Sequence, residues 1–296
     1  MELVEITASV FPPEWQPYEA QPILGQGVIN QVWKLETPAG KMILRGNQGD
    51  LREFHKEAWC MERAAAQGAR VSTLHSYGRI GSWNYMIQSC DGDENGEASS
   101  DKNELWRWMG REMRKVHDIR TPGFGYMLSD DKSGFTSRWR AYRDYCETLI
   151  DRAFDLVRPE TQAVWTKSSL RDEFERMART RYRFGLCHGD LKPGNTVLDH
   201  HGEPTLIDWG CAQANIVPHF EIGEIMRTYK WDGEEIRSFA EGYGLSGAEL
   251  HSIRRDVFTV ALMRAIDLLS WSSKSMPGRV DFYKSSFERL LAQPSV

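Results

Sequence analysis

The sequence has few cysteines, and their spacing excludes the usual cysteine-rich scaffolds. Only five of the 296 residues are cysteine, and no two of them form a C-x-x-C pair. Small secreted domains instead carry dense, even-numbered cysteines, and zinc ribbons carry closely spaced pairs. The five cysteines therefore predict reduced, mostly buried thiols rather than a disulfide framework or a zinc site.

An excess of basic charge is also missing. Lys and Arg total 37 against 42 Asp and Glu, which gives a formal net charge of -5. Proteins that bind nucleic acid usually carry a basic surface, because they must neutralise phosphates. Nucleic acid is therefore not an expected partner.

Long apolar segments are absent as well. Residues 1–11 carry acidic residues and no basic region, which is atypical of a secretory signal. The most apolar late segment, residues 257–271, is interrupted by Arg264 and Asp267 and therefore predicts a core helix rather than a membrane span. We expect a cytoplasmic protein with no membrane contact, present as a monomer or weak dimer.

The pattern of the chain changes near residue 90. Strand-like segments at 23–45 and 84–90 flank a helical segment at 50–67, which stops before Gly68. A polar, acidic connector follows, and beyond it helical periodicity dominates. The expected helices lie at 104–117, 135–155, 160–181, 218–243 and 247–271, and only two short strands, at 195–199 and 204–208, interrupt them.

These patterns predict an α+β protein with two lobes. A small β-rich N-terminal lobe would span 1–90, and a larger, mainly helical C-terminal lobe would span 91–296.

The main candidate site lies in the segment HGDLKPGNTVLDHHGEPTLIDWG, which runs from His188 to Gly210. Its two short strands are joined by a turn containing Gly202, as expected for a hairpin. A hairpin brings its two ends together, so Asn195 and Asp208 should lie close to each other. Amide and carboxylate oxygens are ligands suited to Mg²⁺. Asp190, just upstream, would be a nearby proton acceptor.

This segment resembles the catalytic signature of the aminoglycoside phosphotransferases and their choline-kinase-like relatives, which share the protein-kinase fold. Gly189 stands where the H-R-D motif of protein kinases has arginine, and Trp209 where the D-F-G motif has phenylalanine. The resemblance implies transfer of the γ-phosphoryl group of ATP or GTP to a hydroxyl group. It assigns Asp190 as the catalytic base, and Asn195 and Asp208 as Mg²⁺ ligands.

The resemblance also implies a nucleotide site in the N-terminal lobe. Gly25 and Gly27 would line the phosphates, with Asn30 where the kinase loop has its third glycine. Arg45 occupies the position of the kinase lysine, and a guanidinium is a permanently charged, forked phosphate ligand. Lys41 on the same strand face is an alternative.

Glu57 on the following helix is the expected partner of Arg45, with Glu53 and Glu62 as alternatives. Ile43 would cover the adenine. The backbone groups of Gln88, Ser89 and Cys90 would bind the edge of the base.

The sequence gives less information on the identity of the acceptor molecule. Residues 216–250 hold seven acidic residues against three basic ones, which would suit a polycationic aminoglycoside antibiotic, although an ordinary helix surface explains the same composition. Choline, ethanolamine, homoserine, methylthioribose or another antibiotic are alternatives. A catalytically inactive nucleotide-binding protein is the rival of a different class, and Asp190, Asn195 and Asp208 argue against it because all three are present.

Overall fold

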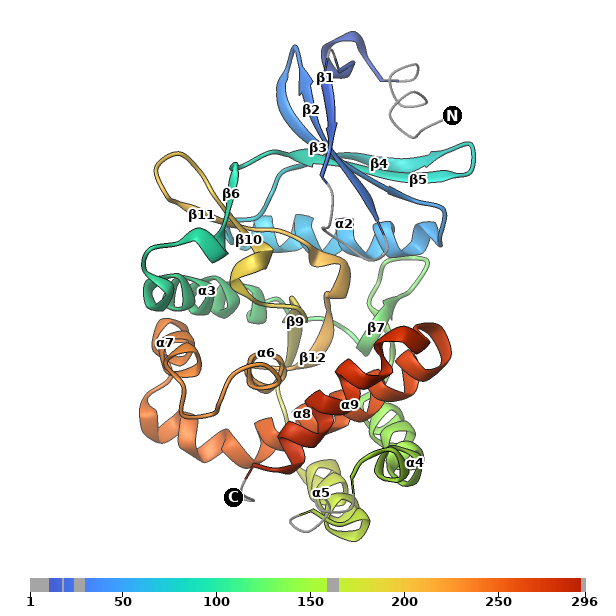
Figure 1. The fold of residues 1–296 in the computed structure, drawn as a ribbon, viewed down its shortest axis with the longest axis vertical. Helices are drawn as coiled ribbons and strands as arrows, with labels where there is room; N and C mark the ends of the chain where they lie inside the picture. The colour runs from blue at the N-terminus through green and yellow to red at the C-terminus, as the bar shows by residue number, and fades with distance from the viewer. Residues whose placement is uncertain (1–10, 18, 24–29, 159–164, 294–296) are drawn as a thin grey trace. The chain divides into compact units, whose positions relative to one another are not determined.

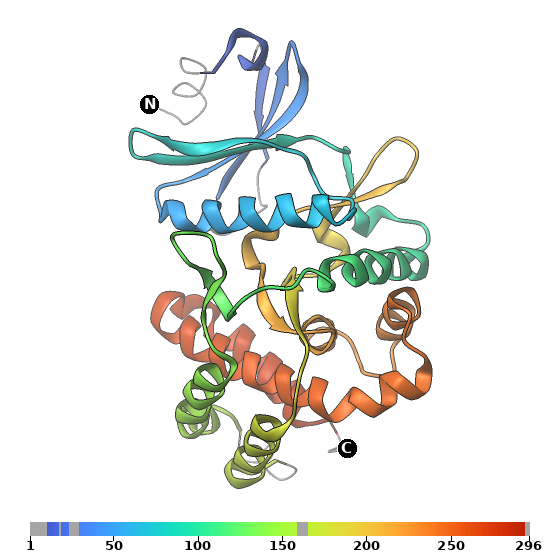
Figure 2. The ribbon, with the colours of Figure 1, turned by 180° about the vertical axis from the view of Figure 1, so that it is seen from behind.

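The structure is a computed structural model that describes residues 11–17, 19–23, 30–158 and 165–293 (Figures 1 and 2). The elements group into two compact units. One unit lies within residues 1–100 and 193–212, and the other within residues 101–192 and 213–296.

The first unit is built on a five-stranded antiparallel sheet with the strand order β1-β2-β3-β5-β4. Along β3, Met42 and Leu44 join a buried cluster on one face of the sheet. Because side chains alternate along a strand, Ile43 and Arg45 point to the other face. The elements are η1 (Pro13–Trp15), β1 (Glu19–Pro22), β2 (Gln31–Thr37), β3 (Gly40–Asn47), β4 (Leu74–Ile80) and β5 (Trp83–Ser89).

Helix α2 (Leu51–Ala66) packs against this sheet through β4 and β5, as Figure 1 shows. Asp50 caps its start by accepting a hydrogen bond from Arg52 N at 3.0 Å. The helix ends before Gly68, which has φ +81°. The expected helix at 50–67 is confirmed.

The same unit contains the expected hairpin. Strands β10 (Thr196–Leu198) and β11 (Pro204–Leu206) pair in antiparallel register, and Gly202 in their turn has φ +80°. β10 also pairs with β6 (Glu94–Asn95), and Arg70 forms an ion pair with Asp199 of the turn at 2.9 Å. The hairpin thus groups with the N-terminal residues, whereas the lobes expected at 1–90 and 91–296 assign it to the C-terminal part.

The remaining elements of the first unit are three short 3₁₀ turns: η2 (Gly96–Ala98), η4 (Pro193–Asn195) and η5 (Trp209–Cys211). In the sequence, η4 directly precedes the hairpin and η5 follows it, so both lie at its open end. The segment 91–103 is therefore more than a polar connector, since it supplies both β6 and η2.

The second unit is mainly helical, in agreement with the predicted α+β class. Its longest helix, α8, contacts α4, α5, α6, α7 and α9. The helices are α3 (Lys102–His117), α4 (Trp139–Leu156), α5 (Lys167–Arg179), α6 (His219–Met226), α7 (Glu234–Tyr243), α8 (Gly247–Ser275), η6 (Pro277–Arg279) and α9 (Val280–Leu291).

Two sequence expectations for this unit are wrong. The helix expected at 218–243 is interrupted between α6 and α7. The unit also contains a four-stranded sheet of order β8-β7-β12-β9, where only helices were expected. Its strands are β7 (Phe124–Leu128), β8 (Phe135–Ser137), β9 (Phe184–Cys187) and β12 (Gln213–Ile216). Strands of three to five residues give too little alternation to detect from sequence.

All five cysteines are free thiols, as expected. None of the helices in the described parts of the chain combines the length and apolarity needed to cross a membrane.

Candidate active site

The two expected metal ligands lie at the same end of the hairpin. Ile207 N donates to Asn195 O at 3.0 Å, just beyond the last strand pair, which fixes Asp208 next to the start of β10. Asn195 is buried, whereas the Asp208 side chain is 50 % exposed. Asp208 also has φ +61°, a left-handed conformation that is uncommon for residues other than glycine and is often found at functional sites.

Arg45, Glu57 and Asp208 come together from three elements. Arg45 Nη1 donates to Glu57 Oε1, and Arg45 Nη2 lies 3.4 Å from Asp208 Oδ1. The Arg45 and Glu57 side chains are 8 % and 3 % exposed. Burial opposes the charge on Arg45, but the carboxylates of Glu57 and Asp208 outweigh it and raise its pKa. The guanidinium is therefore a fixed positive charge beside the hairpin end.

The structure thus brings together Arg45 and Glu57 rather than their alternatives. Lys41 is exposed and forms ion pairs with Asp93 at 3.6 Å and Glu36 at 3.9 Å. Glu62 is exposed on α2.

A second cation holds the segment after Asp208, and the sequence analysis did not identify it. Lys56 Nζ donates to Gly210 O at 2.6 Å, and Lys56 is only 2 % exposed. Burial lowers its pKa. A lysine within an amphipathic helix is typical of a solvated face, so the sequence carries no signal for this contact.

The expected nucleotide-binding residues are only partly supported. Ile43 and Gln88 lie directly opposite each other in the β3–β5 pair. Binding of the base by the backbone of Ser89 and Cys90 stays a prediction. In the structure Ser89 N donates to Thr73 O at 2.9 Å, and Cys90 N to Lys41 O at 3.3 Å.

The expected phosphate loop lies mostly outside the described residues. Gly25 and Gly27 are among the residues not described. Asn30 accepts a hydrogen bond from Asn47 Nδ2 at 2.6 Å, and Asn84 Nδ2 donates to Asn47 Oδ1 at 3.1 Å. Asn30 is therefore tied to the ends of β3 and β5 through an amide network.

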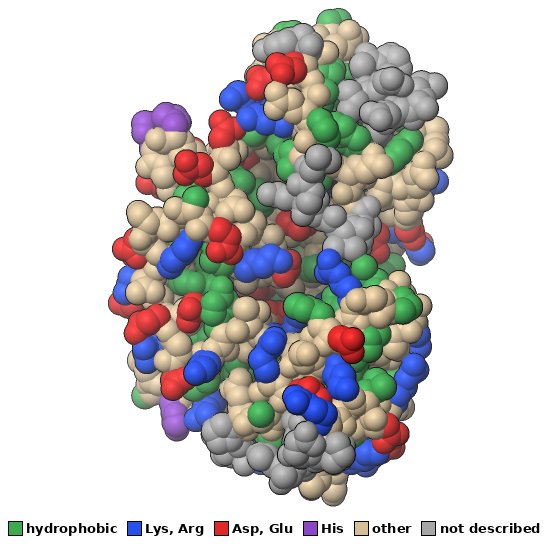
Figure 3. Space-filling view, in the orientation of Figure 1, with side chains coloured by type: hydrophobic (Ala, Val, Ile, Leu, Met, Phe, Trp, Pro, Cys, Tyr) green, Lys and Arg blue, Asp and Glu red, His purple; other side chains and the backbone are tan. Residues whose placement is uncertain are grey.

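A surface cavity of about 450 Å³ lies beside the β10–β11 turn in the same unit. Histidine side chains gather at this exposed turn, where His200 and His201 follow each other (purple in Figure 3). Carboxylates dominate the charged lining of the cavity, which would repel a nucleotide's phosphates. They are Asp91, Asp93, Glu94 and Asp199.

In the second unit, the loop that carries Asp190 follows β9. Gly189 has φ +81°, which explains why a glycine stands here rather than a residue with a side chain. Its N–H donates to Glu221 Oε1 at 2.9 Å. Asp190 Oδ2 accepts from Lys192 Nζ at 2.7 Å, and its side chain is 38 % exposed. Asp190 thus presents an accessible carboxylate on a braced backbone.

Glu221 is the buried support of this loop. It is 0 % exposed, and burial raises its pKa to about 8, against the opposite effect of the Gly189 N–H. His188 is also fully buried.

Most of the acidic residues of the expected acceptor region form ion pairs, a helix cap or a loop contact within the protein. Glu224 pairs with Arg227 at 2.5 Å, and Glu241 with Arg107 at 2.7 Å. The others with structural roles are Glu221 at the loop, Glu234 with Arg237, and Glu249 in the capping box of α8. The two remaining acids are Asp232, which is exposed, and Glu235, which is half-buried. This pairing supports the simpler interpretation, an ordinary helix surface.

Comparison with known proteins identifies the family. A family model described as "Phosphotransferase enzyme family" matches residues 20–255. No curated protein matches the chain in sequence.

Solved structures share the fold. A thermostable mutant of aminoglycoside phosphotransferase APH(4)-Ia is 17 % identical, with a TM-score of 0.67 over 92 % of this chain and 94 % of that one. Spectinomycin phosphotransferase APH(9)-Ia, in complex with ADP and spectinomycin, is 12 % identical, with a TM-score of 0.60 over 93 % of this chain and 90 % of that one. Plasmodium vivax ethanolamine kinase is 14 % identical, with a TM-score of 0.62 over 93 % of this chain and 82 % of that one. The expected protein-kinase-like fold is confirmed.

Proposed function

Because the chain belongs to the phosphotransferase enzyme family, it is an enzyme that transfers phosphoryl groups, and we propose that it phosphorylates a hydroxyl group of a small acceptor. The donor in this proposal is ATP or GTP. Structures with the same fold include complexes with ADP and with AMP-PNP. The single observation that supports the proposal most strongly is the convergence of Arg45, Glu57 and Asp208, because it joins a buried cation to an exposed carboxylate.

Asn195 and Asp208 would hold Mg²⁺ in this scheme. Their donor atoms are hard oxygens at one end of a hairpin, and the exposed Asp208 carboxylate leaves room for water and phosphate ligands. When bound, the ion supplies charge neutralisation for the nucleotide's phosphates. Arg45 binds phosphate oxygens with its forked guanidinium while Glu57 keeps it in place.

Asp190 would orient the acceptor hydroxyl and accept its proton at Oδ2 or Oδ1. The Gly189 N–H bond to Glu221 keeps the loop fixed, and Lys192 Nζ donates a hydrogen bond to Asp190 Oδ2. Positioning and charge stabilisation, rather than covalent chemistry by the protein, supply most of the rate in such reactions.

An aminoglycoside antibiotic remains the favoured acceptor, which would make the chain an antibiotic-resistance enzyme. The support is the resemblance of its motifs and the fold shared with hygromycin B and spectinomycin complexes. Choline or ethanolamine is the second candidate, since an ethanolamine kinase has the same fold. Homoserine and methylthioribose follow. All proposed residues come from one chain, in keeping with a monomer or weak dimer, and a nucleotide donor with reduced thiols fits a cytoplasmic enzyme.

A phosphate-transfer screen tests the proposal. Labelled ATP and GTP are incubated with hygromycin B, spectinomycin, ethanolamine and choline, with and without Mg²⁺. We expect Mg²⁺-dependent labelling of at least one acceptor, and a fall in turnover of at least ~100-fold in Asp190→Ala. Asp232→Ala, an exposed acid of the same unit, is the control and should behave as the wild type.

Two results would count against the proposal. Near-normal turnover in Asp190→Ala would remove its role as base. Nucleotide binding without transfer to any acceptor or to water would favour the inactive nucleotide-binding protein instead.

A further inference from the structure

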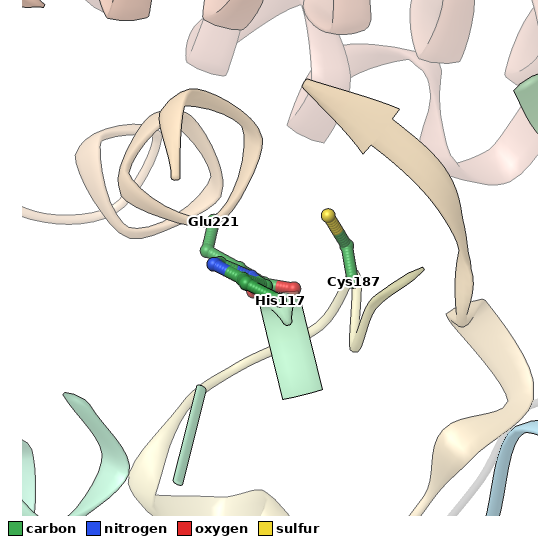
Figure 4. A group of neighbouring side chains, drawn as sticks. All are labelled: His117, Cys187 and Glu221. Atoms are coloured by element: carbon green, nitrogen blue, oxygen red, sulfur yellow. The ribbon is translucent and has the colours of Figure 1, made fainter. Parts of the chain in front are cut away.

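Three potential metal ligands meet in the interior of the second unit. They are His117 at the end of α3, Cys187 at the end of β9, and Glu221 in α6. One imidazole nitrogen, the thiol sulfur and one carboxylate oxygen all lie within 4.8 Å of one another. Figure 4 shows the His117 ring against the Glu221 carboxylate, with the Cys187 sulfur beside them.

Two of these side chains have an unsatisfied polar atom. Among the residues that the structure describes, His117 Nε2 and Glu221 Oε2 have no hydrogen-bond partner, although His117 is 1 % and Glu221 0 % exposed. Cys187 Sγ lies 3.9 Å from Gly185 O, which is long even for sulfur, and it has a further backbone contact with Asn215. An unsatisfied buried polar atom costs about 1–3 kcal/mol, so two side by side indicate that a partner belongs there.

The opposite atoms of both side chains are held by further contacts. His117 Nδ1 lies 3.1 Å from Tyr243 Oη, and Glu221 Oε1 accepts from Gly189 N at 2.9 Å. Metal-binding histidines and carboxylates typically have just such outer partners, which fix the ring and the carboxylate while leaving one atom for the ion. The cluster is therefore oriented as a metal site would be.

We propose that His117 Nε2, Cys187 Sγ and Glu221 Oε2 bind one Zn²⁺ ion. Zn²⁺ accepts this mixture of nitrogen, sulfur and oxygen ligands, whereas Mg²⁺ does not favour a thiolate. Bond lengths of about 2.0–2.3 Å imply donor atoms roughly 3.3–3.6 Å apart in a tetrahedron, so small side-chain movements suffice. Water takes the fourth position.

Charge balance supports an ion of this valence. Zn²⁺ binding releases the protons of the Cys187 thiol and the Glu221 carboxyl group. One thiolate and one carboxylate then neutralise the two positive charges, so the buried site carries no net charge. A neutral site avoids the large cost of an uncompensated charge in the interior.

The expected effect of the ion is to stabilise the loop that carries Asp190. Glu221 contacts Gly189, the residue before Asp190, and Cys187 lies three residues before Asp190. The spacing of the cysteines predicted no zinc site, because no two of them form a C-x-x-C pair. The structure gathers the three ligands from separate segments, and no spacing rule detects such a site.

Metal analysis of the untagged protein tests this directly. The chain is purified without chelator and its zinc content measured by mass spectrometry; we expect about one Zn²⁺ per chain. The metal-free protein is then titrated with Co²⁺, which should produce thiolate-to-cobalt absorption and release about two protons per ion. Cys187→Ala should abolish the absorption and the bound zinc.

Two variants are matched controls. Cys146→Ala removes another buried thiol of the same unit, and Asp208→Ala removes a proposed Mg²⁺ ligand. Both should keep the zinc and the cobalt spectrum. A folded wild type that binds neither Zn²⁺ nor Co²⁺ would overturn the proposal and leave a cluster that holds only protons or water. Cobalt absorption that survives in Cys187→Ala would overturn it as well. Because the wild-type measurement needs no variant, a misfolded variant does not decide the outcome.

Discussion

The buried ion pair of Arg45 and Glu57 makes Glu57→Gln the most informative substitution. The two side chains are 8 % and 3 % exposed, so water screens neither charge. Removing one partner of a buried pair costs about 3–5 kcal/mol, because the other charge is left uncompensated. Glutamine keeps an oxygen that accepts a neutral hydrogen bond, and Asp208 still lies 3.4 Å from the guanidinium. We therefore expect a loss of about 2–3 kcal/mol in the free energy of unfolding.

The catalytic efficiency of the Glu57→Gln variant should also fall. Without Glu57, Asp208 is the one carboxylate partner left to Arg45 in the described part of the chain, and Arg45 would compete with Mg²⁺ for that group. We expect kcat/KM for the nucleotide to fall by about 10–100-fold.

Urea denaturation followed by tryptophan fluorescence measures the stability change, because Trp33 and Trp59 are buried in the same unit. Glu62→Gln is the matched control, since Glu62 is an exposed glutamate of the same helix. It should change stability by no more than about 0.5 kcal/mol. Equal unfolding midpoints for Glu57→Gln and Glu62→Gln would refute the buried-pair reasoning.

Three further predictions concern the same machinery. In Arg45→Lys, an ammonium group can reach only one carboxylate, so calorimetry should show a nucleotide affinity about 10-fold lower. An unchanged affinity would contradict the forked binding of phosphate by the Arg45 guanidinium. Asp208→Gly removes a left-handed residue, so unfolding stability should stay equal or rise by up to about 1 kcal/mol while turnover falls at least ~100-fold; a clear loss of stability would contradict this. Gly189→Ala places a side chain at φ +81° and should cost about 1 kcal/mol in thermal unfolding and at least ~10-fold in turnover, whereas Gly247→Ala, with open space around it, should do neither.

Local signals predicted the parts of the fold that depend on local chemistry. Asp50 and Gly68 delimit α2, and Gly202 permits the turn between β10 and β11. β12 was missed because all four of its residues are buried, so no alternation marks it as a strand. The placement of the hairpin with the N-terminal residues depends on β6 and Arg70, which are distant in sequence.

The residues of the candidate site also fall into two groups, those predicted from sequence motifs and those whose roles depend on tertiary packing. Arg45, Glu57 and Asp208 were found because family motifs fix their spacing. The roles of Lys56 and Glu221 were not predicted from the sequence, since a charged helix residue normally faces solvent and tertiary packing buries these two. Buried charges are therefore the part of the site for which a sequence without its fold gives least information.

The position of Asp208 follows from two adjacent residues of one helix. Glu57 holds Arg45 beside the Asp208 carboxylate, and Lys56 holds the carbonyl of Gly210 two residues later. A left-handed aspartate persists only where its surroundings oppose relaxation, and the Arg45 contact to its side chain and the Lys56 contact two residues later both oppose it. Since Lys56 lies on α2 and Glu57 of the same helix orients Arg45 of β3, a movement of α2 would disturb both contacts. We therefore expect the position of Asp208 to depend on the orientation of α2.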